Sequence, residues 1–230
     1  MIGLMESSPP ESFAVIDVSA WEAEESEEMG ARDKLWIMAK PDLKRPSHLW
    51  KAARSPDNLP EYGADSSAER IAAEIAHLMG VKSARVELAT RDRDRGVISE
   101  RIGGELRHGN ELLSDLHPGY EVAKKGPVTG YDLASIRTVL SEYQGWSVDL
   151  SAFDCFVGLL VFDALVGNTD RHHENWAVVQ DSRELAPSFD HGASLGFNAN
   201  SSQMADAGRY ASKAKARPFG RGIGTLDLAR

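Results

Sequence analysis

The stretch that decides the fold is LVFDALVGNTDRHHENW at residues 160–176, together with PSFDHG at 187–192. An apolar run ends at Gly167, and acid, amide and imidazole side chains follow it directly. A run that is apolar on almost every side is typical of a helix buried in a large lobe. The polar groups behind it are too dense for a solvated turn, and each is by type a metal ligand or a proton acceptor. The sequence therefore places its chemistry in this stretch.

The composition limits the class of protein. Of 230 residues, 42% are hydrophobic and 27% are charged, and the net charge of -9 leaves no basic excess for nucleic acid. The single cysteine, Cys155, lies in an apolar run and has no disulfide partner in the chain. The first thirty residues carry eight acids and no Lys or Arg, and no apolar run reaches the ~18 residues that span a bilayer. We therefore expect a cytoplasmic protein without membrane contact.

The first half of the chain has the pattern of a small sheet with one helix. Residues 1–29 form an acidic segment in which only FAVIDV has a strand pattern, and we expect the rest of it to be solvated. Four further runs have the composition of strands. A proline-containing turn joins 34–40 to 48–54, and a charged turn joins 85–90 to 96–102.

Residues 66–80 form the clearest helix pattern of this half. Ser67 is a candidate N-cap and Gly80 a candidate stop. One helical stripe holds the large apolar side chains and is expected to face the core: Ile71, Ile75, Leu78 and Met79.

The second half is helical. Patterns at 131–144 and 151–167 predict helices, and a short hairpin is expected over 176–187. The fold class is therefore α+β, with a small β-rich N-lobe at 30–105 and a helical C-lobe at 106–200. The tail at 201–230 has six Lys or Arg against two Asp and little periodicity, so we expect it to be partly disordered or weakly docked.

Asp170, Asn175 and Asp190 form the candidate catalytic set. Metal-assisted phosphoryl transfer needs a carboxylate that takes a proton from a hydroxyl. It also needs an amide and a second carboxylate that hold Mg²⁺. An Asp followed five residues later by Asn, and then a Phe-Asp-x-Gly, matches the spacing of the catalytic and metal loops of kinases.

The first half offers the remaining parts of a phosphate site. Gly30 precedes Lys34 and a strand, so backbone N–H groups and a lysine can approach phosphates there. Lys51 lies on the next strand, and Glu69 lies early in the helix that follows, which makes an ion pair between them reasonable. From its order in the chain, we expect the run that contains Glu100 to link the two lobes and to offer backbone groups to an adenine ring.

These motifs occur in a recognisable order: GARDK, LWK, AERIAAEIAHLMGV, VISERI, HGNELL, VFDALVGNTDRHHENW and LAPSFDHGASLG. In this order they resemble the HipA-like family of bacterial kinases, distant relatives of protein kinases and phosphatidylinositol 3/4-kinases. The resemblance covers about residues 30–198, and the last two motifs are the most specific. It implies a two-lobed protein-kinase-like fold that uses ATP and Mg²⁺.

The resemblance also implies the residue roles. Asp170 would be the catalytic base, and Asn175 and Asp190 the metal ligands. The nucleotide-binding set would comprise the phosphate loop from Gly30 through Ala31 to Lys34, then Lys51 with the helix acid Glu69 or its neighbour Glu74, and Glu100. A protein Ser or Thr acceptor and an antitoxin-like or regulatory partner are implied as well. Similar kinases continue through several more helices, so the expected C-lobe is truncated.

Two other functions stay open at this stage. A nucleotide-binding module without catalysis fits the short C-lobe. A metal-dependent phosphohydrolase would use Asp170, His172, His173 and Asp190, although adjacent histidines on a loop usually diverge, and one of them then braces the loop.

Overall fold

The computed structural model describes residues 13–27, 34–39, 47–53, 64–122 and 128–197, with residues 199 and 206. Gly30 and Ala31 lie outside the described residues, as does nearly all of the tail at 201–230. The expected phosphate loop before Lys34 and the expected disorder of the tail therefore stay predictions.

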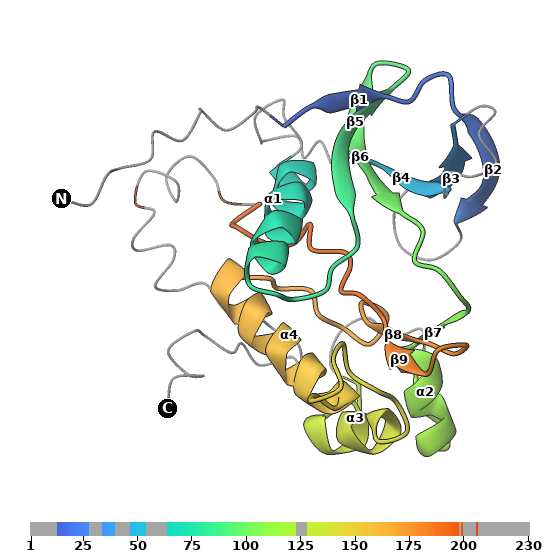
Figure 1. Ribbon diagram of the computed structural model, residues 1–230, viewed down its shortest axis with the longest axis vertical. Helices are drawn as coiled ribbons and strands as arrows, with labels where there is room; N and C mark the ends of the chain where they lie inside the picture. The colour runs from blue at the N-terminus through green and yellow to red at the C-terminus, as the bar shows by residue number, and fades with distance from the viewer. Residues whose placement is uncertain are drawn as a thin grey trace.

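In the N-terminal part, the described residues form a six-stranded sheet with one helix beside it (Figure 1). Its strand order is β1-β5-β6-β4-β3-β2, parallel only between β1 and β5. The strands are β1 (Val15–Asp17), β2 (Glu22–Glu27), β3 (Lys34–Met38), β4 (His48–Ala52), β5 (Val86–Arg91) and β6 (Asp94–Glu100). The four strands expected after residue 30 are confirmed. No strand was expected in the acidic residues after FAVIDV, but β2 pairs with β3 along the sheet edge. Its described side chains, Glu22, Ala23 and Glu24, are exposed, as expected of a solvated segment.

Helix α1 (Ala64–Leu78) is confirmed as a helix, but its buried face was predicted wrongly. Leu78 is 83% exposed and Ile71 is 40% exposed, whereas Ala72 and Ala76 are fully buried. The helix packs closely against its neighbours, and small side chains permit that approach. The helix also starts before Ser67, so Ser67 is not its N-cap.

The described residues of the C-terminal part form three helices and a three-stranded sheet, which lie below the larger sheet in Figure 1. Its elements are β7 (Leu106–His108), α2 (Gly109–Leu116), α3 (Leu133–Leu140), α4 (Ala152–Val166), β8 (Ala177–Val179) and β9 (Glu184–Leu185). The two predicted helices and the hairpin are confirmed. The largest core cluster fills this part, where Phe156 and Leu159 of α4 pack with Trp176.

Both ends of α4 follow from the local sequence. Ser151 and Asp154 form a capping box at its start. Gly167 ends it with φ 65°, a left-handed conformation that glycine adopts without a steric penalty. The chain then turns back over the end of α4, and this turn carries the catalytic-loop candidates.

The two parts meet through the chain between β6 and β7 and through the loop after α1. Backbone hydrogen bonds join Ser188 N to Lys82 O and Ala84 N to Ser188 O, so the α1–β5 connection is fixed to the segment before Asp190. Within the described ranges, none of the helices combines the length and the apolar character needed to cross a bilayer.

Candidate active site

Strands β3 and β4 place two lysines side by side. Lys34 and Lys51 are paired residues in the antiparallel register, so their side chains lie on the same face of the sheet. Lys51 Nζ lies 3.1 Å from Asp190 Oδ1, and Lys34 Nζ lies 3.9 Å from Asp190 Oδ2. Residues that are far apart in the sequence thus form one charged cluster between the two parts of the fold.

Lys51 is the buried centre of this cluster. It is 4% exposed, and its Nζ lies 3.1 Å from Glu69 Oε1 as well as from Asp190 Oδ1. Burial alone would lower the pKa of Lys51, but the carboxylates of Asp190 and Glu69 outweigh it and raise the pKa above its ordinary value. The ammonium group is therefore charged at neutral pH.

The neighbouring strand approaches Lys51 closely because it carries Gly96. A Cβ atom at Gly96 would lie 2.1 Å from the Lys51 carbonyl oxygen. Only glycine lets β6 pass at this distance, so the sequence of β6 helps to fix the backbone from which the Lys51 side chain extends.

The structure decides between the two candidate acids of α1. Glu69 is 2% exposed and pairs with Lys51, whereas Glu74 pairs with Arg70 on the same helix. The ion pair that the sequence suggested between Lys51 and Glu69 is present. Its role in nucleotide binding stays a prediction.

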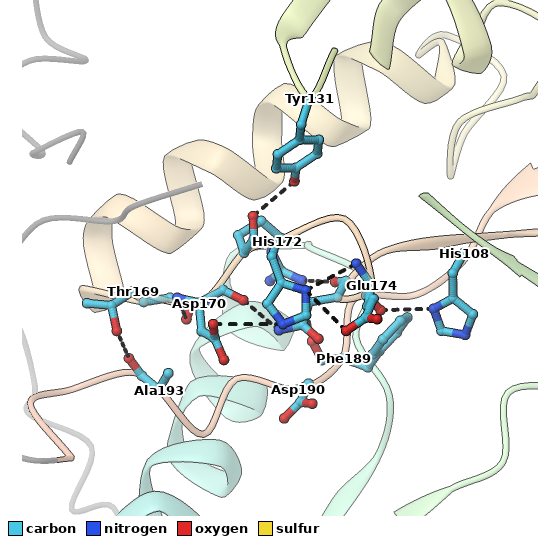
Figure 2. Close-up of polar contacts among 12 residues, drawn as sticks. His108, Tyr131, Thr169, Asp170, His172, Glu174, Phe189, Asp190 and Ala193 are labelled. Carbon is cyan, nitrogen blue, oxygen red and sulfur yellow. Dashed lines mark hydrogen bonds and ion pairs between the residues drawn. The ribbon is translucent and has the colours of Figure 1, made fainter. Parts of the chain in front are cut away.

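The loop after α4 presents Asp170 and Asn175. The Asp170 backbone N–H donates to Asn168 Oδ1 at 3.1 Å, and Asn168 Nδ2 in turn donates to Asp163 Oδ1 at 2.8 Å. The Asp170 side chain is 57% exposed, and Figure 2 shows its carboxylate on the side where Asp190 lies. Asn175 Nδ2 donates to the Asp170 carbonyl oxygen, which leaves Asn175 Oδ1 as the amide atom for a ligand.

Sequence reasoning missed Arg171, which is fully buried and holds the loops together. Its guanidinium group forms a two-point ion pair with Asp163 of α4, Nε to Oδ2 at 2.8 Å and Nη2 to Oδ1 at 3.0 Å. It also donates to the carbonyl oxygens of Asn175 and Phe189. A lone aspartate inside the apolar run FDALV was the available signal, because a buried carboxylate needs a partner.

Asp190 lies in a strained part of the backbone. Its φ of 58° is left-handed, a conformation that Asp tolerates better than most residues. The next residue, His191, is buried and hydrogen-bonds through Nε2 to Ser188 Oγ at 2.6 Å. Burial, helped by the cation of Arg171, lowers the pKa of His191 to about 3. His191 is therefore a neutral packing residue behind Asp190.

The two adjacent histidines of the catalytic loop diverge. His173 is 2% exposed, and its Nδ1 lies 2.7 Å from Tyr120 Oη, while the ring of His172 lies beside Asp170. Among the described residues, no group of three or more His, Cys, Asp or Glu is placed to hold a metal ion. The arrangement gives no support to a histidine-ligated phosphohydrolase site.

Glu100 lies at the end of β6, away from the lysine cluster. Its backbone N–H donates to Arg85 O at 2.9 Å, and its carboxylate faces Arg85 Nε at 3.9 Å. This N–H group is used inside the fold, so any contact of Glu100 with a nucleotide would involve its other groups.

The donor set suits Mg²⁺. Asn175 and Asp190 offer an amide and a carboxylate oxygen, and Mg²⁺ takes few protein ligands, all of them oxygen. The ammonium groups of Lys51 and Lys34 lie beside the Asp190 carboxylate, and lysine is a residue type that binds phosphate groups. By residue type, the described residues thus offer oxygen ligands for a cation, two lysines for phosphate groups and one exposed carboxylate.

The fold and this site define a kinase-like protein. The family model for the HipA-like C-terminal domain matches residues 28–222, and the chain belongs to that family. Among solved structures, the Helicobacter pylori proinflammatory kinase CtkA resembles it with a TM-score of 0.64 and 20% identity, over 88% of this chain and 69% of that chain. The comparison with curated proteins gave no match. The expected kinase-like fold is confirmed.

Proposed function

We propose that this protein is an ATP-dependent phosphotransferase that uses Mg²⁺ and transfers the γ-phosphate to a hydroxyl group, with a protein Ser or Thr as acceptor. The observation that carries the proposal is the buried Lys51, which joins Glu69 of the N-lobe helix to Asp190 of the C-lobe metal loop. Kinases require this lysine–glutamate pair and the metal-binding aspartate to be in place together.

Each residue has a defined task. Lys51 and Lys34 neutralise the phosphate groups of the nucleotide, and Asp170 accepts the proton of the attacking hydroxyl. Asn175 and Asp190 hold Mg²⁺, which when bound neutralises charge that develops on the phosphoryl oxygens. Arg171 fixes the two loops that carry these ligands relative to α4.

The test is a phosphotransfer assay with purified protein, Mg²⁺ and γ-labelled ATP, in which label is followed on the protein itself and on proteins of a cell extract. Asp170→Ala should lower the rate of transfer by at least about 100-fold, since general-base catalysis contributes about that much. ATP affinity should be nearly unchanged, because Asp170 contacts the acceptor hydroxyl. Asp149→Ala, at an exposed position outside the site, is the matched control.

The outcomes separate the alternatives. Undiminished transfer by Asp170→Ala would refute the assignment of the base. ATP binding without any transfer by the unmodified protein would instead indicate a nucleotide-binding module that regulates a partner protein.

A further inference from the structure

His108 has no task in the proposed function, yet its side chain contacts both loops of the candidate site. It is the last residue of β7, directly before α2, and it is half-buried. Its Nδ1 lies 2.9 Å from the backbone carbonyl oxygen of Glu174, a contact that Figure 2 shows as a dashed line. Its ring meets the ring of Phe189 edge to face, with the centroids 5.8 Å apart and the planes at 81°. These two partners directly precede the metal-ligand candidates Asn175 and Asp190 in the sequence.

The hydrogen bond to Glu174 determines which nitrogen of His108 carries a proton. A carbonyl oxygen can only accept, so Nδ1 must be the donor. The charged form of the ring also has a proton on Nδ1, so the hydrogen bond is made in both charge states. The edge-to-face contact with Phe189 is an arrangement that aromatic rings prefer, and it restricts rotation of the imidazole.

This hydrogen bond acts on the peptide group that joins Glu174 to Asn175. At the other end of the same group, the N–H of Asn175 donates to the carbonyl oxygen of His172 at 3.0 Å. The carbonyl oxygen and the N–H of the peptide group are therefore both hydrogen-bonded, and its plane is fixed. The Asn175 side chain extends from this group, so the donor on His108 helps to set the direction of Asn175 Oδ1.

The first residues of α2 contact the same catalytic loop. The N–H of Gly109 donates to Trp176 O at 3.0 Å, and the N–H of Asn110 donates to His173 O at 3.0 Å. A Cβ atom at Gly109 would lie 2.2 Å from a ring carbon of Trp176 and 2.7 Å from His173 O. A larger residue would push the loop away, so the start of α2 is fitted closely to it.

We propose that His108 is a positioning residue for Asn175. Through Nδ1 it holds the peptide group between Glu174 and Asn175, and with it the direction of Asn175 Oδ1, the atom offered to Mg²⁺. Loss of a residue that orients a metal ligand typically lowers metal affinity about 10- to 100-fold. This inference rests on the proposed function, because it takes Asn175 as a metal ligand.

Two substitutions separate the donor of His108 from its ring. His108→Phe keeps a ring against Phe189 but has no donor for Glu174 O. In His108→Asn the side-chain N–H group can take the place of Nδ1, and the ring is lost. Isothermal titration calorimetry measures the affinity for a non-hydrolysable ATP analogue at a series of Mg²⁺ concentrations. We expect His108→Phe to raise the Mg²⁺ concentration that gives half of the maximal affinity roughly 10-fold, and His108→Asn to recover most of this change.

His77→Phe, the same change at an exposed position of α1, is the matched control and should show the Mg²⁺ dependence of the unmodified protein. At saturating Mg²⁺, the affinity of His108→Phe for the analogue should return nearly to that of the unmodified protein. A loss that Mg²⁺ does not restore would indicate general damage to the fold and would overturn the proposal.

Two other results would also overturn the proposal. One is an unchanged Mg²⁺ dependence in His108→Phe. The other is an equal change in His108→Phe and His108→Asn, because a missing donor would then not be the cause. Absence of nucleotide binding by the unmodified protein would instead be a failure of the proposed function itself.

A second measurement uses the unmodified protein and needs neither metal nor nucleotide. ¹⁵N NMR shows which imidazole nitrogen is protonated, and the signals of His108 are those that disappear in His108→Asn. We expect a proton on Nδ1 at every pH at which the protein is folded. A neutral ring with its proton on Nε2 would overturn the proposal, whatever the binding data show.

Discussion

Arg171 shows how one buried charge holds the candidate site in place. Arg171 and Asp163 are both fully buried, so each charge depends on the other for compensation. Arg171→Met should lower the free energy of unfolding by about 3–5 kcal/mol, because it leaves the Asp163 carboxylate buried without its cation. Chemical denaturation measures this change. Addition of Asp163→Asn should recover part of the loss, since it removes the orphaned charge.

The control is Arg85→Met, which removes an 82% exposed guanidinium group that faces Glu100 at 3.9 Å. An exposed pair of this kind contributes less than about 1 kcal/mol. Equal effects of Arg171→Met and Arg85→Met would contradict the structural role of Arg171.

His191 makes stability depend on pH. Folded His191 takes up a proton only near pH 3, whereas the unfolded residue does so near its ordinary value of 6.5. Between these values the unfolded state binds more protons, so the contribution of His191 to stability is full above pH 6.5 and falls as the pH drops towards 3. At pH 5 the loss should be about 2 kcal/mol, from about 1.4 kcal/mol per pH unit.

The measurement compares the unfolding free energy of the unmodified protein and of His191→Gln at pH 7 and pH 5. Gln keeps a hydrogen-bonding group for Ser188 and does not titrate. The variant should lose about 2 kcal/mol less than the unmodified protein over this interval. An equal loss in both would show that folded His191 titrates normally.

Helix α1 is stabilised through its small residues. Ala72 and Ala76 are fully buried and pack with Phe162 and Val166 of α4. Ala76→Leu should therefore lower the free energy of unfolding by about 1–3 kcal/mol, because the added methylene groups have no space. The same change at the exposed Ala134 of α3 should alter it by less than about 0.5 kcal/mol. A neutral Ala76→Leu would mean that α1 and α4 are packed less closely than the structure indicates.

The same helix explains what the sequence could predict and what it could not. Periodicity located the helix, because apolar residues recur at helical spacing on either side of Ala72. The same periodicity predicted the wrong buried face, because Ile71 and Leu78 are more hydrophobic than the alanines. The alanine face is buried only because α4 packs against it. Strand propensity likewise gave no reason to expect a strand in the acidic residues of β2. Pairing with β3 stabilises this strand.

At the candidate site, spacing, order and the family resemblance led to the residues that are proposed to carry the chemistry. Lys51, Glu69 and Asp190 were named from the sequence, and the structure brings them together. The supporting contacts of Arg171 were not foreseen, because they join carbonyl oxygens and side chains from three segments of the chain. Such contacts follow from the folded backbone and leave no periodic pattern in the sequence.

For the whole molecule, the arrangement of charges predicts that the nucleotide joins the two parts of the fold. Lys51 belongs to the N-terminal sheet and Asp190 to the C-terminal part, so one ATP–Mg²⁺ complex would contact both. A ligand that binds only the folded state raises its stability by about 2.7 kcal/mol at a concentration 100 times its Kd. We expect the protein to unfold in a single transition. In the presence of Mg²⁺, the melting temperature of this transition should rise with ATP concentration.

This stabilisation should need both sides of the site and the metal. Lys51→Met removes the phosphate-binding charge from the N-terminal part, Asp190→Ala removes the metal ligand from the C-terminal part, and EDTA removes Mg²⁺ itself. Each should reduce the ATP-dependent rise in melting temperature, whereas Lys82→Met, at an exposed lysine outside the cluster, should not. A rise that survives in Asp190→Ala would show that ATP is held by the N-terminal part alone. Because transfer requires ATP and the Asp170 loop in one complex, that result would remove the structural basis for phosphotransfer.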